Sequence, residues 1–82
     1  MKARVLVRLK PGILDVQGTS VKRALEGLGF DEVRELRVGK VLDLEVEAPD
    51  ALRVRRRVEE MCARLLANPV TEDFTVEILT ES

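Results

Sequence analysis

The stretch ARVLVRL, residues 3–9, decides the fold, because its side chains alternate strictly between two faces. A period of two residues with frequent valine predicts a β-strand that is buried on one side. The other side carries Arg4, Leu6 and Arg8, and its two arginines need opposite charges on the strands beside them. We therefore expect a central strand that packs through Ala3, Val5, Val7 and Leu9.

Two helices are predicted from apolar residues spaced at i, i+3, i+4 and i+7. Thr19 or Ser20 is expected to cap the first helix, and Gly29 to end it in the left-handed conformation. The second helix opens near Asp50, as cap or early-turn acid, and ends at the Asn-Pro pair at 68–69. The predicted buried stripes are Val21, Ala24, Leu25 and Leu28 in the first helix, and Ala51, Val54, Val58, Met61, Cys62 and Leu65 in the second.

Three further strands are predicted at residues 33–38, 41–48 and 74–79. The first two are joined by Gly39-Lys40, a pair typical of a type II′ hairpin. The element order is then β-α-β-β-α-β, which predicts an α+β, ferredoxin-like two-layer sandwich with an antiparallel sheet in one domain, residues 1–82.

The uncovered sheet face is expected to be striped with charge. Arg4 and Arg8 would lie between the acids of residues 43–47 on one neighbouring strand and Glu77 on the other. This face is expected to be either solvated or a polar oligomer interface. Leu6 and Leu79 stand among its charges, which favours at least partial cover by a partner.

Composition excludes several classes of protein. Fourteen basic against fifteen acidic residues give a net charge of −1, and only two residues are aromatic, so nucleic acid and anionic membranes are poor partners. Histidine is absent, which removes the usual neutral-pH general base. The alternating N-terminus is no signal peptide, no apolar run could span a membrane, and a single cysteine suits a reducing compartment. We expect a cytoplasmic protein without a self-sufficient active site.

Three clusters are better explained by structure than by chemistry. Arginines within residues 53–64 form i, i+4 pairs with Glu59 and Glu60, as on a solvated helix face. Cys62 lies in an apolar stripe with no histidine to activate it. The carboxylates of residues 43–47 would not converge on a metal from a flat strand.

The loop from Lys10 to Gly18 admits two interpretations. Backbone amides at the start of the first helix, together with Lys10, would suit a phosphate or carboxylate. Alternatively the loop is simply ordered, with Asp15 accepting hydrogen bonds from backbone donors and Gly18 at positive φ. The second interpretation is favoured, because neither a GxGxxG nor a P-loop spacing is present.

Three stretches taken together resemble a known family: LKPGILDVQG (9–18), LGFDEVRELRVGK (28–40) and MCARLLANPVTEDF (61–74). They are similar to the PurS small subunit of phosphoribosylformylglycinamidine synthase, in the same order and over nearly the full chain. The family usually has an aromatic residue where Asp73 stands, and here Phe74 follows one position later. The positions that match the family pattern are Lys10, Asp15, Gly18, Arg37, Gly39, Lys40, Asn68, Pro69 and Glu72.

The resemblance implies a subunit that bridges two enzymes. In that family a PurQ glutaminase releases ammonia, and a PurL synthetase uses ATP, with Mg expected beside it, to convert formylglycinamide ribonucleotide to the amidine. PurS has neither active site, forms homodimers or tetramers, and is expected to bind no cofactor. The resemblance implies that Lys10, Arg37 and Lys40 contact partners while Asp15 and Glu72 order the loops. The competing interpretation is a stand-alone, ferredoxin-like module that binds a small ligand at the Lys10–Gly18 loop.

Overall fold

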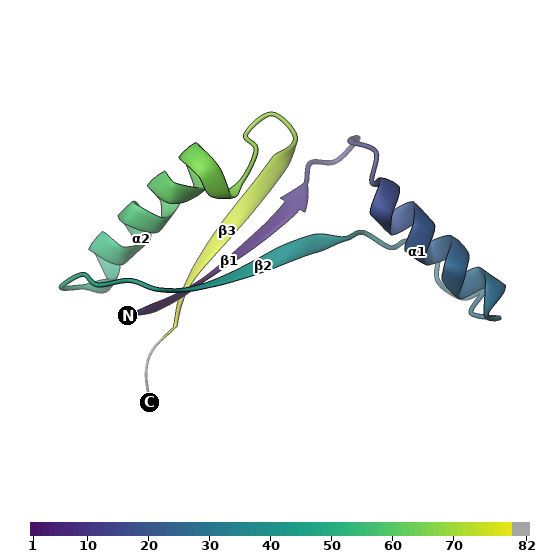
Figure 1. Ribbon diagram of the computed structural model, residues 1–82, viewed down its shortest axis with the longest axis horizontal. Coiled ribbons are helices and arrows are strands. Elements are labelled where there is room, and N and C mark those ends of the chain that lie inside the picture. Colours follow the sequence, from purple (N-terminus) through teal and green to yellow (C-terminus); the bar gives the residue numbers. More distant parts are fainter. Residues whose placement is uncertain (80–82) are drawn as a thin grey trace.

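The computed structural model describes residues 1–79 and contains a three-stranded sheet and two helices (Figure 1). The predicted domain, 1–82, therefore extends three residues beyond the described part of the chain. Neither helix in that part is long and apolar enough to cross a membrane. The elements are β1 (Lys2–Leu9), α1 (Val16–Gly27), β2 (Gly39–Glu45), α2 (Ala51–Met61), a π-helical turn η1 (Cys62–Leu66) that continues α2, and β3 (Glu72–Leu79).

The sheet has the order β2-β1-β3 with both pairs antiparallel, so the predicted central position of residues 3–9 is confirmed. The register places Arg4 between Asp43 on β2 and Glu77 on β3. Its guanidinium Nε lies 2.8 Å from the Asp43 carboxylate. The striped charge that the sequence predicts on this face is therefore present.

The core lies on the opposite face of the sheet, where α2 packs against β1. Ala3, Val5 and Val7 of β1 are 0–1% exposed, in agreement with the alternation of the sequence. Apolar residues of β2 and β3, among them Leu42, Leu44, Phe74 and Val76, pack around this centre while staying partly exposed. The remaining buried apolar residues of the core in the described part of the chain are Val54, Val58, Cys62 and Ala67.

The stripe predicted for α2 is correct at Val54, Val58 and Cys62 but wrong at Ala51, which is exposed, and at Leu65, which is 83% exposed. The cause at Leu65 is the π-helical turn, in which the Ala67 N–H donates to the Cys62 carbonyl five residues back, at 3.0 Å. Each residue after Cys62 is thereby rotated relative to an α-helix. Leu66 therefore packs against the core in the place expected for Leu65.

The strand predicted at 33–38 and the hairpin at Gly39-Lys40 are wrong, because residues 33–38 pair with no strand and β2 begins at Gly39. Gly39 lies opposite Arg8, and a Cβ at this position would come 2.6 Å from the Val7 carbonyl oxygen. The glycine thus permits close approach of two strands rather than a turn. The α+β class and the antiparallel sheet are confirmed, but the sheet has three strands instead of four.

Helix α1 extends away from the end of the sheet instead of covering it (Figure 1). It begins after Asp15 rather than at the predicted caps Thr19 or Ser20, because the Asp15 carboxylate accepts the Gly18 N–H. As predicted, it ends at a left-handed glycine, Gly29, with a φ of +96°. The predicted burial of its stripe is wrong within the protomer, where Leu28 is 74% exposed. The protomer is accordingly elongated, measuring 50 × 32 × 14 Å along its principal axes.

Candidate functional site

Most of the residues singled out by the family pattern lie around the end of β1, where three parts of the chain are joined by hydrogen bonds. These parts are the loop from β1 to α1, the residues that lead into β2, and the loop between η1 and β3. The Lys10 backbone N–H donates to the Thr71 carbonyl at 2.8 Å, which joins the first and third parts. Side chains of Asp15 and Arg37 join the first and second. We call this region the β1-end junction.

Asp15 is the centre of the β1-end junction. One carboxylate oxygen accepts the Gly18 N–H at 2.8 Å and so caps α1, and the other accepts the Val38 N–H at 2.7 Å. These two backbone hydrogen bonds lower the pKa of the Asp15 carboxyl below its ordinary value of 3.8, and the positive charge of Arg37 adds to the effect. The ionised side chain therefore fixes both the start of α1 and the approach to β2.

Gly18 is buried beneath this carboxylate in the first turn of α1. It does not take the positive φ that the ordered-loop interpretation predicts. Within this loop the residue with a positive φ is Gly12, at +87°. A Cβ at Gly18 would lie 2.5 Å from an Asp15 carboxylate oxygen and 2.7 Å from the Leu36 carbonyl oxygen. The position requires glycine because a carboxylate and a backbone occupy the space of the side chain.

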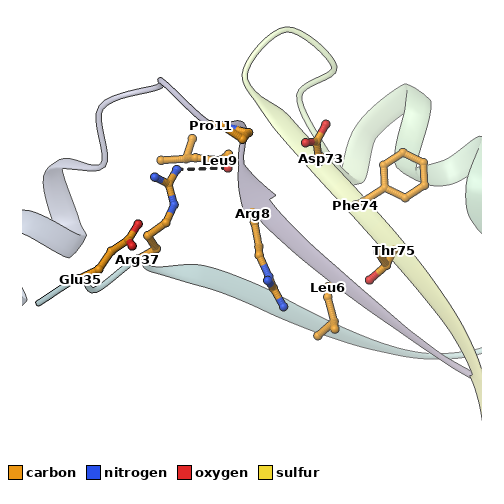
Figure 2. A pocket seen from close by; sticks show the side chains of 9 residues that line it. All are labelled: Leu6, Arg8, Leu9, Pro11, Glu35, Arg37, Asp73, Phe74 and Thr75. Atoms are coloured by element: carbon orange, nitrogen blue, oxygen red, sulfur yellow. Dashed lines mark hydrogen bonds between the residues drawn. The ribbon is translucent and has the colours of Figure 1, made fainter. Parts of the chain in front are cut away.

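The side chains of Arg37 and Lys10 make the other polar contacts of the junction. The Arg37 guanidinium donates to the carbonyl oxygens of Leu9 at 3.2 Å and of Lys10 at 3.3 Å. Figure 2 shows this arginine extended toward the end of β1. The Lys10 ammonium lies 3.6 Å from the Asp73 carboxylate on β3. One predicted contact residue is thus engaged in backbone contacts and the other in an exposed ion pair.

Asn68 and Glu72 close the loop before β3 on itself. The Glu72 carboxylate accepts the Asn68 N–H at 2.8 Å, and the Glu72 N–H donates back to the Asn68 carbonyl at 2.7 Å. The Asn68 side chain also accepts the Val70 N–H at 3.0 Å. Pro69 lies exposed within this closed turn. Reciprocal bonds of this kind give the loop one conformation.

Lys40 and Gly39 border a small hollow of about 180 Å³ next to the junction. Asp15, Gln17 and Glu72 border the same hollow. It therefore brings one cationic side chain beside two acidic ones. The Gly18 N–H is already bound by Asp15, which weakens the interpretation of this loop as an anion site.

A larger pocket of about 450 Å³ lies on the other side of the junction, on the uncovered face of the sheet. Figure 2 shows Leu6, Arg8 and Thr75 projecting from this face. The nine lining residues include no His, Cys or Lys, so the pocket offers guanidinium, carboxylate and hydroxyl groups. The lining residues are Leu6, Arg8, Leu9, Pro11, Glu35, Arg37, Asp73, Phe74 and Thr75.

Sequence reasoning placed Arg8 on the open face but did not bring Glu35 or Asp73 into the site. Asp73 could have been found, because it lies directly opposite Arg8 once β3 starts at Glu72. Glu35 could not, because the expected strand at 33–38 would have carried it to the far edge of the sheet.

Comparison with known proteins points to one family. The chain matches the family model described as PurS, phosphoribosylformylglycinamidine (FGAM) synthase, over residues 2–80. It is 42% identical over 77 residues to the phosphoribosylformylglycinamidine synthase subunit PurS of Methanocaldococcus jannaschii, a match that covers 94% of this chain and 93% of the relative.

Solved structures agree with the sequence match. The crystal structure of PurS from Methanocaldococcus jannaschii superposes with a TM-score of 0.90 at 40% identity, covering 99% of this chain and 98% of the other. A chain in the structure of PurLQS from Thermotoga maritima superposes with a TM-score of 0.87 at 33% identity, covering 95% of each chain.

Proposed function

Because the chain belongs to the PurS family of phosphoribosylformylglycinamidine synthase, we propose that it is the non-catalytic subunit that bridges the glutaminase and the synthetase of that ligase. The observation that carries the proposal is the similarity, over nearly the full length of the chain, to a chain of PurLQS from Thermotoga maritima. The partners are then a PurL-type synthetase and a PurQ-type glutaminase. Further copies of this chain complete the assembly.

The chemistry of the reaction explains why such a subunit is needed. Ammonia released into water near neutral pH becomes mostly ammonium, which is not a nucleophile. Transfer inside an assembly preserves the free base and keeps the activated substrate away from bulk water. A small domain assists by fixing the distance and orientation between two larger active sites.

The β1-end junction supplies the rigidity that this role requires. Asp15 and Arg37 together join the first two segments through three hydrogen bonds, Asp15 also caps α1, and Glu72 closes the third segment. We assign Lys10, Arg37 and Lys40 to partner contacts and Asp15 and Glu72 to the ordering of the loops. ATP and Mg belong to the synthetase in this scheme, this chain binds no cofactor, and the complex works in the cytoplasm.

Amidine formation by the glutaminase and synthetase subunits, with and without this chain, tests the proposal. Glutamine and free ammonia are compared as nitrogen donors. The chain is expected to restore the glutamine-driven reaction and to leave the ammonia-driven reaction nearly unchanged. A chain that alters neither rate and co-elutes with neither subunit would contradict the proposal.

A further inference from the structure

The uncovered face of the sheet carries two arginines of β1 whose surroundings differ. The register places Arg4 between Asp43 and Glu77, and the Arg4 Nε lies 2.8 Å from the Asp43 carboxylate. The charge of this guanidinium is therefore balanced within the protomer. Arg8 lies four residues further along the same face, where equal balance would need an acid on each neighbouring strand.

Arg8 does not have these partners. The residue opposite it on β2 is Gly39, where a Cβ would come 2.6 Å from the Val7 carbonyl oxygen, so no acidic side chain fits there. On β3 it lies opposite Asp73, whose carboxylate is 3.6 Å from the Lys10 ammonium. Figure 2 shows the side chains of Arg8 and Asp73 pointing in different directions. None of the ion pairs in the described part of the chain involves Arg8, so its charge is not balanced there.

The Arg8 side chain lines the pocket of about 450 Å³ on this face, which we call the open-face pocket. Thr75 and Leu6 line the same pocket and project from the same face (Figure 2). The threonine offers a hydroxyl that can donate a hydrogen bond, and the leucine offers half-buried apolar surface. The open-face pocket therefore combines an unbalanced cation, a second donor and apolar surface that another molecule can cover.

The acids of the lining favour a ligand with a single negative charge. Glu35 and Asp73 both line the open-face pocket, so a doubly charged phosphate would be repelled. Figure 2 shows Glu35 away from the Arg8 guanidinium, whose donors it does not occupy. The forked donors of a guanidinium match the two oxygens of a carboxylate. The ligand that fits is therefore a carboxylate.

The exposure of the pocket favours a carboxylate that belongs to a protein. Arg8 and Thr75 are exposed, and an ion pair in water is screened by salt and contributes little. A small carboxylate free in solution would thus bind weakly. A protein surface laid over the pocket would take the same ion pair out of water and bury Leu6 with it.

We propose that the open-face pocket receives an aspartate or glutamate side chain of a protein partner, the synthetase or the glutaminase, and that its carboxylate pairs with the Arg8 guanidinium. This inference rests on the proposed function and names the chemical group by which the bridging subunit recognises an enzyme. The acid that Gly39 excludes from β2 is then supplied by the partner. The partner surface also covers Leu6.

Replacement of Arg8 tests the pairing. Arg8→Met removes the charge and keeps an unbranched side chain, and Arg56→Met removes an exposed arginine of α2 as the matched control. Each full chain is titrated calorimetrically into an equimolar mixture of the synthetase and glutaminase, and far-UV circular dichroism shows that the variants stay folded. Arg8→Met is expected to bind about 30-fold or more weakly and Arg56→Met as tightly as the unaltered chain. Equal affinities for all three chains would overturn the proposal.

Carbodiimide coupling identifies the occupant. The reagent activates a carboxylate, and a lysine amine in contact with it displaces the activating group to form an amide. Arg8→Lys places such an amine in the open-face pocket, and Arg56→Lys places one outside it as the control. Mass spectrometry of the coupled complex should find an amide between position 8 and an acid of one enzyme, and none from position 56 to either enzyme. Coupling of position 8 only to another copy of this chain, or to neither enzyme, would contradict the proposal.

A free carboxylate is tested on the chain alone. Sodium glutamate is added while the NMR signal of the Arg8 Nε–H is followed. We expect no saturation at millimolar concentrations. Saturable binding that shifts this signal would show that the pocket takes a small molecule, and the protein side chain would be the wrong occupant.

Glutamine-driven amidine formation separates this proposal from the proposed function. If the unaltered chain restores the reaction and Arg8→Met binds equally well, the open-face pocket is wrong while the proposed function stands. If the unaltered chain binds an enzyme through Arg8 but restores nothing, the proposed function is wrong while the pairing stands. A chain that binds neither enzyme would overturn both.

Discussion

The carboxylate of Asp15 accepts the backbone N–H of Val38 at 2.7 Å, across 23 positions of sequence. With its other oxygen on the Gly18 N–H, the same side chain caps α1 and aligns the residue that leads into β2. Residues 33–38 form no strand, and their last residue, Val38, is held by this side-chain contact instead of by pairing with a strand.

Asp15→Ala should lower the melting temperature and fray α1, because both backbone donors lose their acceptor. Asp15→Asn keeps one acceptor oxygen and should have a smaller effect. Asp31→Ala, at an exposed position just after α1, is the control and should leave the melting temperature nearly unchanged. Thermal unfolding followed by circular dichroism measures all three, and equal melting temperatures for Asp15→Ala and Asp31→Ala would show that the contact contributes nothing.

The same contact should make stability depend on pH in the acid range. Folding lowers the pKa of Asp15 below 3.8, so the folded state binds the proton less tightly than the unfolded state does. The stabilisation is then complete above the unfolded pKa and is lost as the pH falls through the lowered folded pKa. Urea unfolding between about pH 2.5 and pH 6 should show a shallower loss of stability for Asp15→Asn than for the unaltered chain. Parallel curves for the two proteins would exclude the assignment.

Two glycines of α1 should respond in opposite directions to the same substitution. Gly27→Ala adds a Cβ with nothing within 4 Å and should stabilise the chain by about 0.4–1 kcal/mol. Gly18→Ala places that atom against Asp15 and the Leu36 carbonyl and should destabilise by ~1–3 kcal/mol. Urea unfolding at neutral pH measures both, and a stabilising Gly18→Ala would show that the junction can expand to admit a methyl group.

Arg37→Ala should weaken binding to the synthetase and glutaminase by about tenfold or more while leaving the sheet folded. The guanidinium orders the Leu9 and Lys10 carbonyls and lines the pocket of Figure 2. Arg37→Lys keeps the charge but not the forked pair of donors and should recover only part of the affinity. Arg34→Ala serves as the exposed control for loss of a positive charge. Unaltered assembly of Arg37→Ala would remove this residue from the partner surface.

The Cys62 thiol should be protected from modification in the folded chain. It is fully buried, and burial together with the negative charge of Glu59 raises its pKa above the ordinary value of 9.0. Val70→Cys adds an exposed thiol to the same molecule as an internal control. With a chromogenic disulfide reagent at pH 8, one thiol per chain should react at once and the second only on unfolding in urea. Two equally fast thiols would show that the core opens readily.

The sequence was sufficient where a residue's neighbours alone determine its structure. Alternation in residues 3–9 identified the central strand and its buried face, and helical spacing identified Val54 and Val58. The predictions that failed concern residues whose structure depends on contacts distant in the sequence. The Gly39-Lys40 pair has the composition of a turn, but Gly39 is required by the nearness of the Val7 carbonyl, which no local pattern reveals.

Two other differences between the prediction and the structure arise from features that hydrophobic periodicity does not reveal. The apolar spacing of α1 predicted a buried stripe, but the stripe is largely exposed in the protomer, because spacing does not place the helix relative to the sheet. The π-helical turn at Cys62–Leu66 inserts a rotation that exchanges the roles of Leu65 and Leu66, and neither residue type signals it. In the site, the family pattern identified Asp15 and Arg37. Their hydrogen-bond partners are backbone groups, which a sequence pattern does not identify.

The shortest dimension of the protomer, 14 Å between Cα atoms, limits how far apart it can keep two enzymes. Bodies that contact opposite faces of one layer of sheet and one layer of helix are separated by little more than the diameter of a helix with its side chains. In the bridging role proposed above, two enzymes that contact these two faces would be held close together. A neutral molecule as small as ammonia would then have a short diffusion path, with little time to gain a proton on the way.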